Sequence, residues 1–278
     1  MQLREIAVYA DASEAMATCL DTAAALASTH QAHLVAFHIK GRPVAFADMS
    51  GTMSADLIEL QEEYARQEAE KAQAAVRAAE QRSGLTIEWR MAEGDVAGTA
   101  LLYARYADLV VVSQAPIDDN RGAPAIDMPE TLVMGSGRPV LIVPRYGKFP
   151  TVGQQVLVAW KRTREATRAV HEALPILERA KSVRVVEFNP ATDEVAQHIP
   201  GADIAAHLAR HGVKVEVSSM TVSGDIEVGD AMLSTAADQG TDLLVMGAYG
   251  HSRLREFAFG GVSRHLLRHM TVPVLMSH

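Results

Sequence analysis

The sequence predicts an α/β protein made of two tandem doubly wound domains, each with a parallel sheet flanked by helices. Three observations lead to this class. Short apolar runs alternate with alanine-rich stretches, the second half of the chain repeats the first, and a segment containing two glycines and a proline separates the halves. At 278 residues, the chain has the length of two ordinary domains.

Two sets of counterparts define the repeat. The first set shares an offset of 134 positions and pairs Asp108 with Asp242, Pro139 with Pro273, and Leu141 with Leu275. The second set shares an offset of 150 positions and pairs residues 6–11 with 156–161, and residues 34–37 with 184–187. The difference predicts about 16 extra residues in the middle of the first half, between Gly41 and Gly84.

Continuous apolar runs predict strands that are buried on both faces, as in a parallel sheet. Such runs occupy Leu109–Val112, Leu141–Val143, Val156–Ala159 and Leu243–Met246. Alanine-rich stretches between the runs predict helices at Glu14–Ser28, Arg164–Arg179 and Ala231–Gln239. Strands that alternate with helices favour right-handed βαβ units and hence a doubly wound sheet.

The segment Leu57–Arg82 is predicted to be one long helix, because opposite charges recur in it at i,i+3 and i,i+4 spacings. A solvated helix that covers one face of the sheet is the favoured interpretation, and a lid or partner-binding helix is the alternative. The segment Arg145–Gln154 has no apolar periodicity and is the predicted linker. The predicted domains are residues 1–146 and 154–278.

Composition narrows the classes of function. The formal net charge of −8 disfavours nonspecific nucleic-acid binding, and Cys19, the single cysteine, can form neither an intramolecular disulfide nor a thiolate cluster. No segment approaches the roughly 20 apolar residues of a membrane helix, and the start of the chain lacks a signal-peptide pattern. The expected location is therefore the cytoplasm, with neither nucleic acid nor membrane as a partner.

A glycine-rich loop follows the strand predicted at 243–246, in the stretch MGAYGHSRLREFAFGGVSRHLL. In open parallel sheets, ligands bind beyond the carboxyl ends of the strands. Glycine permits close approach of a ligand, and a helix that begins near Val262 would direct N–H groups toward an anion. Ser263 could add a hydroxyl or cap this helix. The pattern favours a phosphate site over a merely tight loop.

The spacing Gly247-x2-Gly250-x9-Gly260 resembles the nucleotide-binding signature of the universal stress protein (UspA-like) family. Because each half has a strand rhythm similar to this family's, the chain resembles a tandem member over nearly its whole length. The resemblance implies that each domain is a five-stranded parallel sheet of the adenine nucleotide alpha hydrolase-like class. It also implies pairing through the last strand, with ATP as the cofactor, which Mg²⁺ could accompany.

By position, the resemblance and the ends of the neighbouring strands give the residues expected to bind the nucleotide. They are Ala159, Trp160, Lys161, Phe188, Met246, Gly247, Gly250, His251, Gly260, Gly261, Val262 and Ser263.

Two of these positions depart from the family pattern. Gly261 stands where Ser or Thr is usual, which removes a hydroxyl but keeps the backbone N–H. Lys161 stands where nucleotide-binding members usually carry an Asp that contacts the nucleoside. A lost charge-assisted hydrogen bond is worth about 1.5–3 kcal/mol. Lys161 and Arg162 either contact phosphates or remain solvated.

The first half has lost the signature. Ser113, Pro116, Ile126 and Asp127 occupy the places of the four glycines. Pro116 lacks an N–H, and Asp127 places a negative charge where a phosphate would lie. Asp11 keeps the nucleoside-facing carboxylate, so a pocket for another small molecule stays open, but a domain kept for dimer geometry is favoured. Since this half folds without the glycines, we expect them to serve a ligand in the second half.

The chain contains none of the motifs Gly-x-x-x-x-Gly-Lys-Ser/Thr, Gly-x-Ser-x-Gly and His-Glu-x-x-His. His251 could contact phosphates, but Glu256 is a weak candidate for its catalytic partner. The helical pairs His207/His211 and His265/His269 have a zinc-compatible spacing without an obvious third ligand, so surface histidines are favoured.

We therefore expect a stress-response or signalling protein that binds ATP or a related adenine nucleotide in its second domain and acts through binding rather than catalysis. A dimeric interaction scaffold that binds no nucleotide and a weak ATPase are the alternatives. The two domains are expected to form an intramolecular pseudo-dimer, and two chains could pair further into a homodimer.

Overall fold

The computed structural model describes residues 2–42, 55–116, 127–189, 201–222, 225–248 and 261–278. The first half contributes the strands β1 (Glu5–Tyr9), β2 (His33–Gly41), β3 (Ile87–Gly94), β4 (Leu109–Ser113) and β5 (Val140–Val143). Its helices are α1 (Met16–His30), α2 (Ala55–Ser83), α3 (Val96–Ala104) and α4 (Met128–Gly135).

The second half repeats this order. Its strands are β6 (Gln155–Trp160), β7 (Ser182–Phe188), β8 (Val215–Met220), β9 (Leu243–Gly247) and β10 (Val274–Ser277). Its helices are α5 (Arg164–Leu177), α6 (Ala202–Arg210), α7 (Asp225–Asp238) and α8 (Gly261–His269). The predicted linker, Arg145–Gln154, joins β5 to β6 without forming a helix or a strand.

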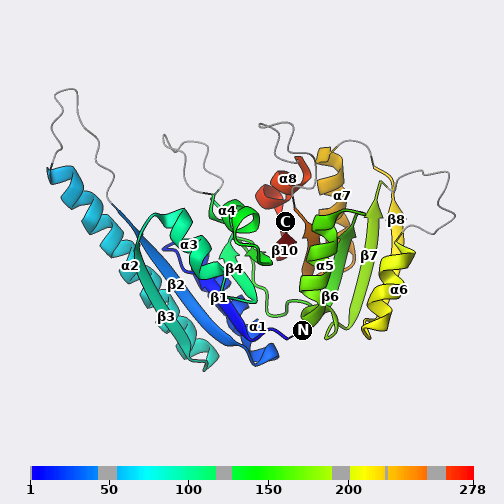
Figure 1. Ribbon diagram of the computed structural model, residues 1–278, viewed down its shortest axis with the longest axis horizontal. Coiled ribbons are helices and arrows are strands. Elements are labelled where there is room, and N and C mark those ends of the chain that lie inside the picture. Colours follow the sequence, from blue (N-terminus) through cyan, green and yellow to red (C-terminus); the bar gives the residue numbers. More distant parts are fainter. Residues whose placement is uncertain (1, 43–54, 117–126, 190–200, 223–224, 249–260) are drawn as a thin grey trace.

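The ten strands of the described residues form one sheet, in the order β3-β2-β1-β4-β5-β10-β9-β6-β7-β8 (Figure 1). Neighbours within each half are parallel, whereas β5 and β10 are antiparallel, with Leu141 opposite Leu275. The predicted class of two tandem α/β domains is thus confirmed. The predicted contact between the halves, through the last strand of each, is also present.

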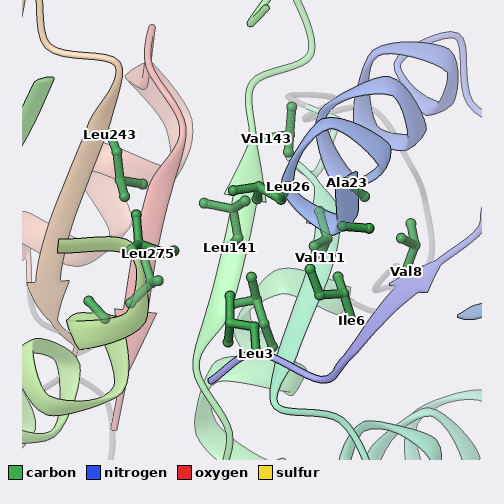
Figure 2. Packing of buried hydrophobic residues seen from close by; sticks show 14 of the residues in the cluster. Leu3, Ile6, Val8, Ala23, Leu26, Val111, Leu141, Val143, Leu243 and Leu275 are labelled. Carbon is green, nitrogen blue, oxygen red and sulfur yellow. The ribbon is translucent and has the colours of Figure 1, made fainter. Parts of the chain in front are cut away.

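The strands are apolar on both faces because helices cover both sides of the sheet. Side chains such as Ile6 and Val8 join one apolar cluster with α1, α2, α5 and α6, and Ala7 joins another with α3, α4, α7 and α8. Figure 2 shows the first cluster running from β1 across β4 and β5 to Leu275 and Leu243. Burying each such leucine stabilises the fold by about 1.5–3 kcal/mol.

The repeated aspartates hold the amino edge of the sheet. The Asp242 carboxylate accepts hydrogen bonds from the backbone N–H groups of Gly153, Gln154 and Gln155, at 2.9–3.1 Å. Its counterpart Asp108 accepts from the first residues of β1 in the same way. The repeated aspartates therefore attach the start of the first strand of each half to the start of its fourth strand.

One predicted register is wrong by a residue. The sequence paired residues 34–37 with 184–187, but the sheet makes Leu34 equivalent to Val183. The defining pairs are Ile6–Leu34 and Val156–Val183. The offset for this strand is therefore 149 positions, and the counterpart of Glu187 is His38 rather than Phe37. Residues 34–37 are continuously apolar and offer no alternation against which to align residues 183–188, where Arg184 and Glu187 interrupt the apolar positions.

The extra residues of the first half are also distributed along the chain differently from the prediction. Ile87 pairs with Leu34 as Val215 pairs with Val183, so the offset falls from 149 to 128 positions between the second and third strands of each half. It then rises to 134 at the fourth strands. The predicted 16 residues are thus a net difference, and the long helix α2 carries the insertion.

We expect Asp242→Ala to lower the free energy of unfolding by about 1.5–3 kcal/mol, because three backbone N–H groups lose a charged acceptor. Urea denaturation measures the change. Asp238→Ala, at an exposed position in α7, should change stability by less than about 0.5 kcal/mol. Equal effects of the two substitutions would contradict a structural role for Asp242.

Candidate functional site

The candidate site lies at the carboxyl edge of the second half, where the strand order reverses. β6 and β9 are neighbours there, with Ala159 opposite Met246. The chain leaves β6 for α5 on one face of the sheet and leaves β9 for α8 on the other face (Figure 1). Such a switch point leaves a crevice between two helix N-termini, which is the usual ligand position in open α/β sheets.

The structure brings nine of the twelve predicted site residues to this edge. They are Ala159, Trp160, Lys161, Phe188, Met246, Gly247, Gly261, Val262 and Ser263. The other three, Gly250, His251 and Gly260, lie outside the described residues.

Several of these residues face the core. The side chains of Ala159, Phe188 and Met246 are 5–7% exposed and join the apolar cluster beneath α7 and α8. Trp160 is half-buried and packs on the opposite cluster, while Lys161 is exposed. The buried residues at the strand ends can therefore meet a ligand through their backbone, and Lys161 through its side chain.

Gly247 has a packing role that the sequence did not reveal. A Cβ at this position would lie 2.6 Å from the carbonyl carbon of Glu165, 2.8 Å from Cα of Ala166, and closer still to the Ala166 nitrogen. Helix α5 therefore rests on the backbone of β9 at this point. The prediction that the fold itself does not need the glycines is wrong for Gly247.

The first half accommodates Ser113 at the equivalent position because its helix begins differently. Helix α5 starts at Arg164 after Thr163, whose hydroxyl accepts a hydrogen bond from Ala166 N–H. Helix α1 starts only at Met16, two positions later in the repeat, and its N-terminus has no side-chain cap. The earlier start brings α5 close enough to β9 to require glycine there.

The N-terminus of α5 is already occupied by its own acidic residue. Glu165 is 6% exposed and accepts a hydrogen bond of 2.8 Å from the Arg164 guanidinium. Burial alone would raise the pKa of the Glu165 carboxyl, but hydrogen bonds from its own backbone N–H and from Arg164 outweigh burial and lower it. An external anion therefore meets a carboxylate at this helix end.

Helix α8 differs at its N-terminus from its counterpart α4. In α4, the Asp127 carboxylate accepts a hydrogen bond of 3.0 Å from the backbone N–H of Glu130, so the chain itself places a negative charge at this end. Burial raises the pKa of the Glu130 carboxyl, and the charge of Asp127 raises it further. In α8, Gly261 stands in place of Asp127 and brings no side chain. Gly261, the first residue of α8, thus brings no carboxylate to this helix end, which favours an anion there.

A buried carboxylate at this edge was missed by the sequence prediction. Glu187, next to the last residue of β7, is 4% exposed. Its Oε1 lies 4.0 Å from Nε of Arg162, and its Oε2 has no hydrogen-bond partner. The predicted alignment made Glu187 the counterpart of the apolar Phe37, so the sequence did not mark this position as a polar one.

The histidine pairs contact other side chains of the described residues. His265 hydrogen-bonds Asp230 at 2.7 Å and lies 4.5 Å, between ring centroids, from His269. His207 lies between His171 and His211, with ring centroids 4.9 and 4.7 Å apart. Across the part of the chain that the structure describes, no three His, Cys, Asp or Glu side chains are arranged to hold a metal ion. None of the helices in that part combines the length and apolar character needed to cross a membrane.

Comparison with known sequences covers both halves of the chain. The sequence model of the universal stress protein family matches residues 2–144 and again residues 153–278. Universal stress protein Slr1230 from Synechocystis sp. (strain ATCC 27184 / PCC 6803 / Kazusa) is 38% identical over 68 residues. That alignment covers 24% of this chain and 22% of the relative, so it spans less than a quarter of either protein.

Solved structures share the complete tandem fold. A universal stress protein from Archaeoglobus fulgidus DSM 4304 matches with a TM-score of 0.74 at 16% identity, covering 99% of this chain and 96% of that chain. A functionally unknown protein from Pseudomonas aeruginosa PAO1 matches with a TM-score of 0.59 at 16% identity, covering 99% and 92%. These likenesses establish the fold.

We expect Gly247→Ala to lower the free energy of unfolding by about 1–3 kcal/mol without any ligand present, because its Cβ would press on the backbone of α5. Ser113→Ala, at the equivalent position of the first half, should be nearly neutral, since its buried hydroxyl meets only the weakly hydrogen-bonding thiol of Cys19. Chemical denaturation of both variants measures this. A fully stable Gly247→Ala protein would show that this glycine is not required for packing.

Proposed function

The chain belongs to the universal stress protein family, and from this premise we propose that its second half binds ATP or a related adenine nucleotide. We propose further that the protein acts in stress response or signalling through binding rather than catalysis, in the cytoplasm. The observation that carries the proposal is the contrast between the two halves at one helix end. Gly261 begins α8 where Asp127 caps α4.

The phosphates would lie at the N-terminus of α8. The glycine signature leads directly into this helix, whose first N–H groups and positive dipole end favour an anion. Gly247, Gly250 and Gly260 keep the family spacing, and Gly261 and Val262 would offer backbone N–H groups. Ser263, in the first turn, is 5% exposed. Mg²⁺ could enter with the nucleotide.

The nucleoside would lie toward the ends of β6 and β7, where Lys161 and Arg162 are both exposed. Two adjacent cations raise the local attraction for a polyphosphate and suit its oxygens. They also explain how a chain with a formal net charge of −8 can attract an anion at this edge. A nucleotide of high negative charge is therefore favoured over a neutral nucleoside.

A dimeric interaction scaffold is the second candidate, and the sheet topology favours it. The β5–β10 pairing makes within one chain the contact between two domains, and it needs no ligand. In this case the first half, whose α4 is capped by Asp127, would serve geometry alone. A homodimer of chains would add a further level of assembly. Phosphate release above background would instead support a weak ATPase.

ATP should raise the melting temperature of the wild-type protein in proportion to the logarithm of its concentration. At 100 times Kd, the gain in unfolding free energy is about 2.7 kcal/mol. Gly261→Asp should abolish the shift, because it reproduces the carboxylate that Asp127 places on α4. Differential scanning fluorimetry measures both.

Two control variants distinguish the effect of the charge added by Gly261→Asp from an effect of the substitution on folding. Gly261→Asn, which is uncharged, should retain most of the ATP shift, and Asp127→Gly in the first half should leave it unchanged. If the Gly261→Asp protein keeps the wild-type change in melting temperature with ATP, α8 is not part of the binding site. No shift in the wild-type protein would rule out nucleotide binding and favour the scaffold.

A further inference from the structure

Glu187 is a buried acceptor without a donor, at the edge where the ligand is proposed to bind. Its side chain is 4% exposed, and Oε2 accepts no hydrogen bond. The separation of 4.0 Å between Oε1 and Nε of Arg162 is an ion-pair distance, too long for a hydrogen bond. Leaving a buried charged acceptor unsatisfied is unfavourable, so its retention needs a partner.

Glu187 lies near the carboxyl end of β7, with its carboxylate close to Arg162 in the turn after β6. Val183 and Val185 of β7 belong to the apolar cluster on the α5 and α6 face, and Glu187 follows on the same face two residues later. Arg162, in the turn between β6 and α5, approaches it from above the strand ends. The carboxylate thus lies behind the turn that contains Lys161.

The first half satisfies its own residue at this position. His38, the counterpart of Glu187, donates from Nδ1 to the carbonyl oxygen of Ala10 at 2.7 Å. A carboxylate cannot make that hydrogen bond, because it is an acceptor. At this position the first half satisfies its polar side chain internally, whereas Oε2 of Glu187 in the second half has no hydrogen-bond partner.

We propose that Glu187 recognises the nucleoside end of the nucleotide by accepting a hydrogen bond from a ribose hydroxyl or from the exocyclic amine of the base. This inference rests on the proposed nucleotide binding. Glu187 then acts as a specificity-determining residue, and it supplies from β7 the carboxylate that position 161 lacks.

The spacing of the strands supports this assignment. Adjacent strands lie about 4.8 Å apart, so β7 and β9, with β6 between them, are separated by about 10 Å. A nucleotide with its phosphates at α8 would therefore extend its nucleoside toward β7. A carboxylate repels phosphate and accepts hydrogen bonds from hydroxyl or amine groups, which selects the nucleoside end of the ligand.

The test compares nucleotide selectivity in the wild-type protein and in Glu187→Gln. Calorimetric titration with ATP, 2′-deoxy-ATP, 3′-deoxy-ATP and inosine triphosphate identifies the donor. We expect the wild type to bind the analogue that lacks the donor about 10–100-fold more weakly than ATP, as for a lost charge-assisted hydrogen bond. Glu187→Gln should reduce the ratio between the affinities for ATP and for this analogue at least about fivefold. Weak binding of a deoxy analogue identifies a ribose hydroxyl as the donor, and weak binding of inosine triphosphate identifies the amine.

A second variant and a control make the outcome unambiguous. Glu187→Met should melt, without nucleotide, at or above the wild-type temperature, since it removes a buried carboxylate whose Oε2 has no hydrogen-bond partner. Glu216→Gln, on β8 with its carboxylate exposed and paired with Arg184 at 2.8 Å, should leave selectivity unchanged.

Two results would overturn the inference. They are a wild-type protein that binds all four nucleotides equally, and a Glu187→Gln protein that keeps the wild-type ratios. If the ATP shift disappears in Gly261→Asp while Glu187→Gln keeps the wild-type ratios, only this inference fails. If the wild type binds no nucleotide at all, the proposed function fails and this inference falls with it.

Discussion

Antiparallel pairing between β5 and β10 is the contact on which the rest of the architecture depends. Both strands are apolar on both faces and fully buried, and either would be an exposed, aggregation-prone edge if its half stood alone. Pairing them inside one chain leaves β3 and β8 as the outer edges, and both carry exposed polar side chains. This requirement explains why a first half without the glycine signature is retained: it covers the central edge of the half that carries the signature.

With the sheet fixed in this way, the carboxyl edges of the two halves could diverge. In the first half, Asp127 caps α4 and His38 hydrogen-bonds a backbone carbonyl, so both of these side chains have partners within the chain. In the second half, Gly261 and Glu187 stand at those positions, and neither makes the equivalent contact. The two halves therefore differ in side-chain hydrogen bonding at equivalent places of the same fold.

Much of the fold could be predicted, because the signals were strong and local. Helix α2 differs from its predicted bounds, Leu57–Arg82, by two residues at the start and one at the end, since its charge spacing continues without interruption. The predicted alignment of β2 with its counterpart β7 was wrong by one residue, because the continuous apolar run of β2 carries no alternation. The contact of Gly247 with α5 and the burial of Glu187 join residues far apart in sequence, so no local pattern could reveal them.

The presence of Lys161 in place of an Asp can be explained from the other residues at the carboxyl edge of the second half. The family resemblance implies an Asp at the end of the first strand as an acceptor for a nucleoside, and Lys161 removes that acceptor while adding a cation. If Glu187 supplies the acceptor from the next strand, Lys161 and Arg162 lie between it and the helix end proposed to hold phosphates. Arg162 then offsets part of the repulsion between that carboxylate and a polyphosphate. The second half would thus keep the same chemistry for a nucleotide while distributing it differently over β6, β7 and α8.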